Sequence, residues 1–295
     1  MLRYAAIDIG SNAVRLLIAD IIKNGKVISF KKNTLIRVPL RLGDDAFLHK
    51  YISDRKKEDL AKTMSAFRNL MDVYQVTDYM ACATSAMREA KNGDSVIQEV
   101  AKTGIKLTII DGNQEATMIY NSHLEKQFDR KKTVMYIDVG GGSTELSLFS
   151  NTELIASRSF DIGTIRILDN QDKDETWAAM KCWVKKYAGK LKTVIGVGTG
   201  GNINKIARIA NENVEKPLTF AKLKATYEYL NAFTLKDRIH VLGLNDDRAD
   251  VIIPACEIFI TLMKWVNMRT LYIPRIGLAD GMVQTLIEKN FPDVT

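Results

Sequence analysis

The apolar positions of the first half of the chain fall into short runs separated by polar turns. Two apolar runs and a third beyond an Asn-Gly turn are typical of an antiparallel strand meander, and the segments after them alternate between helical and strand periods. The predicted elements are strands at 4–8 and 14–22, a third strand after Asn24-Gly25, a helix at 53–74, a strand at 78–83, a helix from Ser85 and a strand at 105–110.

The second half repeats this order. Its predicted elements are strands at 134–138 and 145–149, a turn at Ser150-Asn151, a strand ending at Phe160, a helix at 175–191, a strand at 194–197 and a helix from Asn202. Ile7-Asp-Ile-Gly10 and Ile137-Asp-Val-Gly140 occupy equivalent places, as do Thr84-Ser85 and Thr199-Gly200. An accidental match is the alternative, but four features recur in order. We therefore predict two mixed-sheet α/β lobes that face each other across a cleft lined by these turns.

Composition agrees with two ordinary globular domains. The chain has 295 residues, of which 46% are hydrophobic and 26% charged, which excludes a disordered chain. The net charge of +7 favours anionic partners without naming one. Among possible anionic partners, nucleic acid has the least support, because the chain lacks clustered aromatic residues and a docking helix.

Several chemistries and locations are excluded. The three cysteines, Cys82, Cys182 and Cys256, are too dispersed for a disulfide framework or a thiolate zinc site, and the chain has no H-x-x-x-H or G-x-S-x-G motif. Asp8 interrupts the N-terminal apolar stretch, which argues against a signal peptide, and the most apolar segment, 251–266, is too short to span a bilayer. We expect a cytoplasmic protein with no membrane partner.

The segment from Asp138 to Glu145, Asp-Val-Gly-Gly-Gly-Ser-Thr-Glu, is the strongest candidate for chemistry. Three glycines after a strand let the backbone approach a ligand closely and direct N–H groups at phosphate oxygens. The two terminal carboxylates can meet at the turn and hold Mg²⁺ beside a phosphate. A simple β-turn with a glycine bulge is the alternative, and the acids at both ends favour the binding site.

Other polar turns extend this pattern. Candidate phosphate contacts are Ser11 and Asn12 in the first copy, Thr84 and Ser85 at a strand-to-helix junction, Arg88 one turn later, and the turn 198–201 at a helix N-terminus. Arg88 can equally be a surface arginine. Glu115 lies just beyond a strand and could act as a general base, although the residues alone favour a first-turn glutamate stabilised by the helix dipole.

Together these motifs resemble the exopolyphosphatase and guanosine pentaphosphate phosphatase family, a branch of the actin-like ATPase and sugar kinase superfamily. The resemblance covers nearly the whole chain and rests on six motifs in family order, which are 8–12, 83–90, 112–116, 138–145, 198–201 and 247–254. It implies two ribonuclease H-like lobes with mixed five-stranded sheets flanking a central cleft. The lobes would be 1–118, completed by a C-terminal helix in 280–295, and 119–279.

The resemblance also implies an activity and a site. The family hydrolyses the terminal phosphoanhydride of inorganic polyphosphate or guanosine pentaphosphate with Mg²⁺. Glu115 would activate water, and Asp138 and Glu145 would hold the metal with Asp8 through water. The implied phosphate ligands are Ser11, Asn12, Thr84, Ser85, Arg88, Gly140, Gly141, Gly142, Ser143, Thr199, Gly200 and Gly201. Arg248 and Asp250 are interpreted as structural, in an ion pair or helix cap.

Three departures from the family pattern leave alternatives open. Ala13, Asn202 and Ala279-Asp280 stand where the family commonly has Ser or Thr, Thr, and Arg-Glu. They could weaken phosphate binding or shift the preferred substrate, so a non-catalytic sensor of guanosine tetraphosphate or pentaphosphate is one alternative. An ATP-dependent kinase of the same superfamily is another, because the glycines of 198–201 partly supply the adenosine contacts that such a kinase would need. The preferred substrate and a homodimer are left open.

Overall fold

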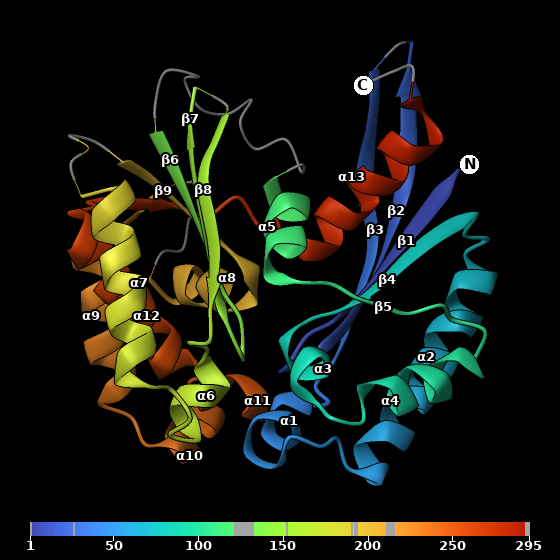
Figure 1. The fold of residues 1–295 in the computed structure, drawn as a ribbon, viewed down its shortest axis with the longest axis horizontal. Coiled ribbons are helices and arrows are strands. Elements are labelled where there is room, and N and C mark those ends of the chain that lie inside the picture. The colour runs from blue at the N-terminus through green and yellow to red at the C-terminus, as the bar shows by residue number, and fades with distance from the viewer. Residues whose placement is uncertain are drawn as a thin grey trace. The chain divides into compact units, whose positions relative to one another are not determined.

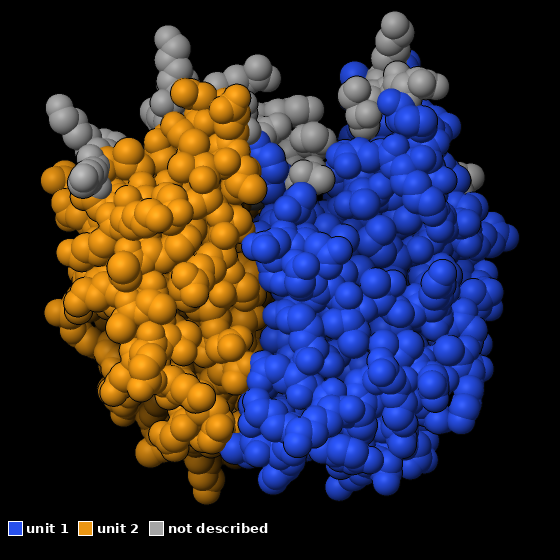
Figure 2. All heavy atoms as spheres, in the orientation of Figure 1, with its two compact units in different colours: residues 1–122, 277–295 blue, residues 123–276 orange. Residues whose placement is uncertain are grey.

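The computed structural model describes residues 2–25, 27–120, 133–151, 153–189, 191, 194–210 and 216–292 (Figure 1). The chain divides into two compact units, with residues 1–122 and 277–295 in unit 1 and residues 123–276 in unit 2 (Figure 2). The lobe boundaries at 118 and 279 stay predictions, and residues 293–295 of the expected terminal segment lie outside the described residues.

Unit 1 holds the first strand meander and its crossover helices. Its elements are β1 (Arg3–Ile9), β2 (Val14–Asn24), β3 (Val27–Val38), α1 (Leu42–His49), α2 (Asp54–Val73), β4 (Asp78–Ala83), α3 (Ser85–Glu89), α4 (Gly93–Ala101), β5 (Thr108–Ile109), α5 (Gly112–Tyr120) and α13 (Leu278–Asn290). The described sheet has the order β3-β2-β1-β4-β5. β1 pairs antiparallel with β2 and parallel with β4, as expected when a hairpin is followed by a helical crossover.

The last helix completes the core of unit 1. α13 buries Leu278, Met282 and Leu286 against β1 and α5, so apolar residues at helical spacing supply one side of that core. Asp280 fixes the start of the helix, because its carboxylate accepts from the backbone N–H of Gly277 at 3.0 Å. The same carboxylate pairs with Lys32 on β3 at 2.6 Å, which joins the helix to the edge strand.

Unit 2 holds the second meander. Its elements are β6 (Thr133–Val139), β7 (Thr144–Ser150), β8 (Glu153–Phe160), α6 (Thr164–Leu168), α7 (Asp174–Tyr187), β9 (Val194–Thr199), α8 (Gly200–Ala210), β10 (Leu218–Thr219), α9 (Phe220–Asn231), α10 (Leu235–His240), α11 (Asp246–Ala249), α12 (Ile252–Val266) and β11 (Thr270–Tyr272). The most apolar stretch of the sequence becomes α12, which is buried on most of its surface. No helix of the described chain is long and apolar enough to cross a membrane.

The sheet of unit 2 differs from the expectation in its size. Its described strands are six rather than five, in the order β10-β11-β9-β6-β7-β8. The additional pairing joins two residues of β10 to β11 in antiparallel register at the sheet edge. Strands this short carry no alternating pattern, so the periodicity could not predict them.

The two units repeat the same strand pairing. β6 pairs antiparallel with β7 and parallel with β9, just as β1 pairs with β2 and β4. Asp8 lies opposite Arg15 and beside Cys82, whereas Asp138 lies opposite Glu145 and beside Thr199. The two aspartates therefore occupy equivalent positions at the ends of equivalent strands.

Candidate functional site

The turn after β1 is held in place by its neighbours in unit 1. The backbone N–H of Gly10 donates to Ala13 O at 3.1 Å, and the hydroxyl oxygens of Ser11 and Ser85 lie 2.8 Å apart. Ser11 and Asn12 are buried, and their carbonyl oxygens accept from the backbone N–H groups of Gly43 and Arg41 at 2.8 and 3.0 Å. The contacts therefore bring the first predicted phosphate turn and the junction after β4 together.

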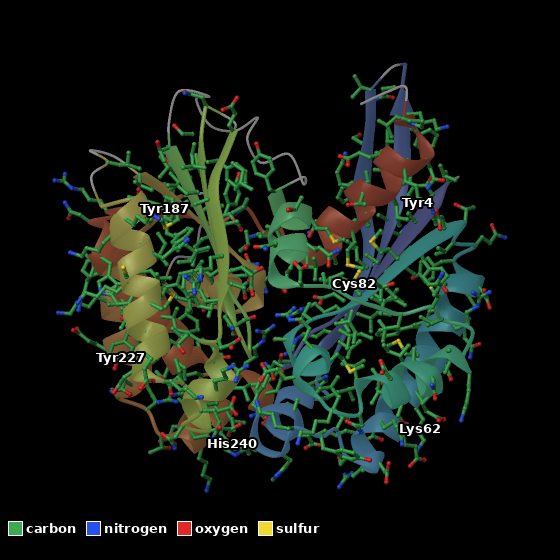
Figure 3. The ribbon with its side chains drawn as sticks, viewed as in Figure 1. Tyr4, Lys62, Cys82, Tyr187, Tyr227 and His240 are labelled. Atoms are coloured by element: carbon green, nitrogen blue, oxygen red, sulfur yellow. The ribbon has the colours of Figure 1, made fainter. Side chains whose placement is uncertain are left out.

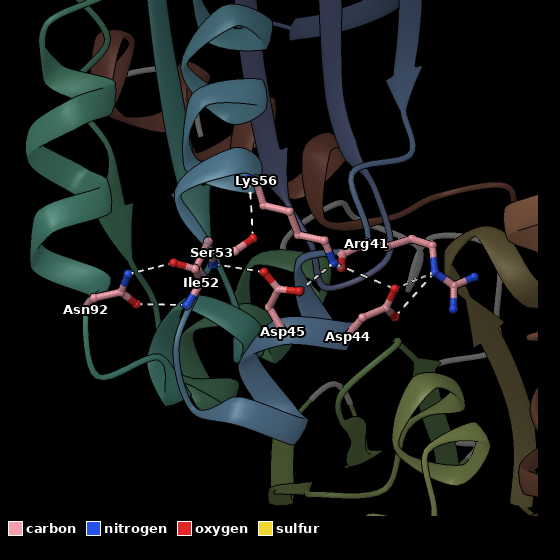
Figure 4. A network of polar contacts seen from close by, with 7 residues as sticks. All are labelled: Arg41, Asp44, Asp45, Ile52, Ser53, Lys56 and Asn92. Carbon is pink, nitrogen blue, oxygen red and sulfur yellow. Dashed lines mark hydrogen bonds and ion pairs between the residues drawn. The ribbon is translucent and has the colours of Figure 1, made fainter.

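A polar network surrounds Arg41, whose backbone N–H donates to Asn12 O (Figure 4). Arg41 adopts the left-handed conformation at φ 50°, and its carbonyl accepts from the ammonium group of Lys56 at 2.5 Å. That ammonium also lies 3.1 Å from Asp45, whose other oxygen accepts from the backbone N–H of Ser53 at 2.8 Å. Burial alone would raise the pKa of Asp45, but the hydrogen bonds from Ser53 and Lys56 outweigh burial and lower it. The network anchors the segment that contacts Asn12.

Glu115 and Arg88 meet beyond the ends of β4 and β5. The Arg88 guanidinium donates to the carbonyl of Ile110 at 2.7 Å and lies 3.9 Å from the Glu115 carboxylate, whose side chain is only 13% exposed. Burial, together with the nearby charges of Asp8 and Glu115, raises the pKa of the Cys82 thiol on β4 to about 12 (Figure 3). Both carboxylates therefore lie near Cys82, at one end of the sheet.

Asp8 has a cation directly opposite it in unit 1. The Arg15 guanidinium donates to the Asp8 carboxylate at 2.6 Å across the β1–β2 pair, and Asp8 is buried. This ion pair compensates the charge of Asp8 within its own hairpin. A role of Asp8 in metal binding through water stays a prediction, and in that role it would be shared with Arg15.

The equivalent hairpin of unit 2 places two acids opposite each other. Asp138 and Glu145 are register partners in β6 and β7, so their side chains lie on one face of the hairpin. Glu145 is buried and accepts from the hydroxyl of Ser159 at 2.7 Å. The turn between them closes with a hydrogen bond from Gly140 N to Ser143 O at 2.9 Å, as Gly10 and Ala13 do in unit 1. Two neighbouring carboxylates are the oxygen ligands that Mg²⁺ prefers.

The turn after β9 approaches Asp138 closely. Gly200 has φ 87°, and a Cβ atom there would lie 2.5 Å from Asp138 Oδ1, so only glycine fits. Thr199 is 1% exposed, and its hydroxyl has no hydrogen-bond partner among the described residues. Gly200 also begins α8. Its own N–H group donates to Ile276 O at 3.3 Å, so the N–H groups that follow it in the first turn are the ones that an anion could bind.

Arg248 and Asn202 add to this turn, although sequence reasoning gave neither a binding role. A Cβ atom at Gly201 would lie 2.5 Å from the Arg248 guanidinium. Arg248 donates to Asn202 Oδ1 at 2.9 Å, and the Asn202 amide donates to Val139 O at 3.1 Å. Arg248 lies in the motif 247–254, for which the sequence predicts a structural role, in an ion pair or a helix cap. In the fold Asn202 links Arg248 to the strand that ends at the glycine turn.

Contacts thus bring predicted site residues together within each unit. In unit 1 the contacts unite the Ser11–Asn12 turn with Ser85, and Arg88 with Glu115, whereas unit 2 unites Asp138, Glu145 and Gly200. No group of three or more His, Cys, Asp or Glu side chains suited to a metal occurs within the described parts of the chain. The metal site therefore stays a prediction that rests on the Asp138–Glu145 pair.

Known proteins share this sequence pattern and fold. The sequence profile of the Ppx/GppA phosphatase family matches residues 26–290. The chain belongs to the Ppx/GppA phosphatase family. This membership confirms the family resemblance and the prediction that the chain is a hydrolase of phosphoanhydride bonds, since relatives in the family include an exopolyphosphatase and a guanosine pentaphosphate pyrophosphatase.

The matches to individual relatives cover different shares of this chain and of the relatives. Exopolyphosphatase 1 of Mycobacterium leprae is 24% identical over 96% of the chain and 88% of its own length. A bifunctional 3-dehydroquinate synthase/phosphatase of Fusobacterium nucleatum is 33% identical over 64% of the chain but only 30% of its own length. The guanosine-5'-triphosphate,3'-diphosphate pyrophosphatase of Aliivibrio fischeri is 25% identical over 97% of the chain and 59% of its own length. The chain thus spans less than two thirds of the last two proteins.

Solved structures of Ppx/GppA proteins share the fold. The exopolyphosphatase from Cytophaga hutchinsonii has a TM-score of 0.84 at 22% identity and covers 97% of this chain and 98% of its own. The Aquifex aeolicus family member has a TM-score of 0.76 at 24% identity and covers 98% of both chains. These matches confirm the predicted fold class, an α/β protein built from actin-like lobes.

Proposed function

We propose that this protein is an Mg²⁺-dependent exopolyphosphatase that removes terminal orthophosphate from inorganic polyphosphate, with guanosine pentaphosphate as the second substrate to test. One observation carries the proposal. Asp138 and Glu145 lie opposite each other beside a glycine turn, and Gly200 at the start of α8 is in contact with Asp138. This combination suits a divalent cation together with the phosphate chain that it accompanies.

The residues of unit 2 fit Mg²⁺. Asp138 and Glu145 would hold the ion with carboxylate oxygens, and waters would complete the shell that Mg²⁺ retains. When bound, the ion supplies positive charge that stabilises phosphate oxygens during transfer. The hydrogen bond from the Ser159 hydroxyl fixes one oxygen of Glu145, which orients the carboxylate before the ion arrives.

Backbone groups and hydroxyls are suited to bind the phosphates. Among the described residues, no acceptor bonds the backbone N–H groups of Gly141, Gly142 and Ser143, while the glycine carbonyls are already bonded. The Thr199 hydroxyl is also buried without a partner in the described structure. A polyphosphate oxygen would satisfy these donors. Binding them costs little reorganisation, because the turn is already fixed.

Glu115 is the proposed general base. Its carboxylate lies in the first turn of α5, next to the Arg88 guanidinium, which orients it. In the reaction it would accept a proton from the water that attacks the terminal phosphorus, while the remaining phosphate chain leaves with the electron pair of the broken anhydride bond. Positioning and proton transfer are the contributions that phosphoryl transfer to water requires.

A screen of orthophosphate release tests the proposal. The purified protein is assayed with polyphosphates of several lengths, guanosine pentaphosphate and ATP, with Mg²⁺ or with a chelator. We expect Glu115→Gln to lower kcat by about 10² to 10⁴ with an unchanged melting temperature. Glu99→Gln, at a partly exposed carboxylate of α4 that pairs with Lys102, serves as the control.

Other outcomes would overturn the assignment. Full activity of Glu115→Gln would exclude it as the base. Calorimetric binding of guanosine tetraphosphate with no phosphate released at any Mg²⁺ concentration would indicate a sensor, and formation of ADP with a phosphorylated acceptor would indicate a kinase. A cytoplasmic location and the absence of a nucleic-acid partner stay predictions.

A further inference from the structure

The segment from Asp161 to Leu168 forms the back of the glycine turn of unit 2. The carbonyl of Gly140 accepts from the backbone N–H of Thr164 at 3.0 Å, and that of Gly141 accepts from Ile165 N at 2.8 Å. The carbonyl of Gly142 accepts from the Nε atom of Arg166 at 2.5 Å. All three glycine carbonyls are therefore bonded to the first turn of α6.

The contact between this segment and the turn is backbone against backbone. A Cβ atom at Gly163 would overlap the carbonyl group of Gly141 and the carbonyl carbon of Gly142, so no side chain fits there. The Arg166 side chain is only 5% exposed, and its guanidinium lies 3.7 Å from the exposed carboxylate of Asp161. Burying a guanidinium is costly, and its retention needs a compensating interaction.

The orientation of the glycine peptides decides what the turn can bind. A glycine peptide can rotate with little steric penalty, so its carbonyl can point either way. With the carbonyls directed at α6, the neighbouring N–H groups face away from it and can bind an anion, whereas the opposite orientation would present carbonyl oxygens to phosphate oxygens. A donor on the α6 side therefore favours the binding-competent turn.

The equivalent turn of unit 1 uses a different set of donors. The carbonyls of Ser11 and Asn12 accept from the backbone N–H groups of Gly43 and Arg41. In unit 2 the first two glycine carbonyls are likewise bonded by backbone N–H groups, but the third is bonded by a side chain. Of the hydrogen bonds to the three glycine carbonyls, the one from Arg166 is therefore the one that a side-chain substitution can remove.

We propose that Arg166 is a positioning residue for phosphate binding: by donating to Gly142 O it holds the Gly141–Ser143 turn with its N–H groups directed at the substrate. The inference rests on the proposed function and deepens it, because it assigns the orientation of the phosphate turn to a residue that need not touch substrate. In this role Arg166 acts through the backbone of Gly142.

Three variants test the role of Arg166. Arg166→Met keeps the length of the aliphatic stem and removes the donor, Arg166→Lys keeps a charged donor, and Arg158→Met removes an exposed cation from the neighbouring β8 as the matched control. The measured quantities are KM and kcat for tripolyphosphate, the inhibition constant of orthophosphate, and the melting temperature. For Arg166→Met we expect KM and the inhibition constant to rise together by about tenfold, the effect of losing a charge-assisted phosphate contact.

The remaining variants separate positioning from general stability. Arg166→Lys should recover most of the lost affinity, while Arg158→Met should match the parent protein. A destabilised but correctly oriented turn would lower the melting temperature and leave both constants unchanged, and that result would overturn the inference. If Arg166→Met does not fold, Arg166→Leu gives the same test, because its side chain carries no donor for Gly142 O.

The two proposals fail in different ways. If the parent protein releases no orthophosphate from any substrate, the proposed function fails. If the parent protein is active and Arg166→Met has the parent KM and orthophosphate inhibition constant, the proposed function stands and the role of Arg166 is wrong.

Discussion

Gly281 offers a sharp test of how α13 supports the site in unit 1. A Cβ atom at this position would overlap the backbone carbonyl of Met118 on α5 and lie 3.1 Å from Ile119 N. Alanine is the better helix former by about 1 kcal/mol, so the substitution Gly281→Ala would stabilise an isolated helix. In the protein, however, neither backbone can yield, and α13 must move away from α5 by about 1 Å in a close-packed core.

The expected cost follows from this overpacking. Apolar contacts between α13 and Ile119 are lost, and an overpacked core typically loses about 1 to 3 kcal/mol. We expect a fall in melting temperature of about 6 °C for a net loss near 2 kcal/mol. Because α5 also carries Glu115 one turn before Met118, a shift of about 1 Å should lower kcat by up to about 10².

The matched control is Gly277→Ala, at the start of the same helix. A Cβ atom there meets nothing within 4 Å, so only the preference for glycine over alanine at a helix N-cap is lost, about 1 kcal/mol or less. Thermal unfolding followed by circular dichroism and single-substrate kinetics give both readouts. Equal melting temperatures and equal kcat for the two variants would refute the packing argument.

Three further predictions concern other contacts. Thr199→Val should lower kcat/KM by about tenfold with little change in melting temperature, because the buried hydroxyl has no partner in the described structure and, in the proposed function, would donate to the substrate; an unchanged kcat/KM would exclude this role. Lys56→Met should destabilise the protein by about 1 to 3 kcal/mol in urea denaturation, since Arg41 O and Asp45 lose a charged donor, and Lys62→Met, in an exposed ion pair, is the control. Hydrogen bonds from Arg3 and Asn33 lower the pKa of Asp20 below its unfolded value, so their stabilisation is present above about pH 4 and is lost as the pH falls through the folded pKa. Asp20→Asn should therefore lower the free energy of unfolding by about 1.5 kcal/mol at pH 7, and the difference from the parent protein should vanish toward pH 2; a difference independent of pH would contradict it.

The strands and turns of the site were predictable because local pattern determines them. An apolar run that ends in Asp-x-Gly specifies a buried strand and a tight turn, and the seven-residue spacing from Asp8 to Arg15 and from Asp138 to Glu145 sets the register across each hairpin. The strand expected at 105–110 pairs only at Thr108–Ile109, although Ile105, Leu107 and Ile110 are buried. An apolar run predicts that its residues are buried, but buried residues need not pair with a neighbouring strand of a β-sheet.

The supports of the turns were not predictable, because they come from distant segments. Arg166 lies on a five-residue helix that is too short to show a period, and its distance from Gly142 in the sequence gives no indication of contact. Lys56 similarly opens an amphipathic helix as one of several lysines, and only the fold shows that it bonds Arg41 O. Such contacts join segments that are distant in the sequence and meet only in the folded chain. No local pattern in a single sequence indicates which segments will meet.

The use of α13 in unit 1 has a consequence for biosynthesis. Unit 2 is built from one uninterrupted segment, whereas the first unit takes Leu278, Met282 and Leu286 from the far end of the chain. During translation the ribosome delivers every residue of the second unit before that helix emerges. We therefore expect the nascent first unit to stay incomplete, with an apolar surface open to chaperones, until the final helix has left the exit tunnel.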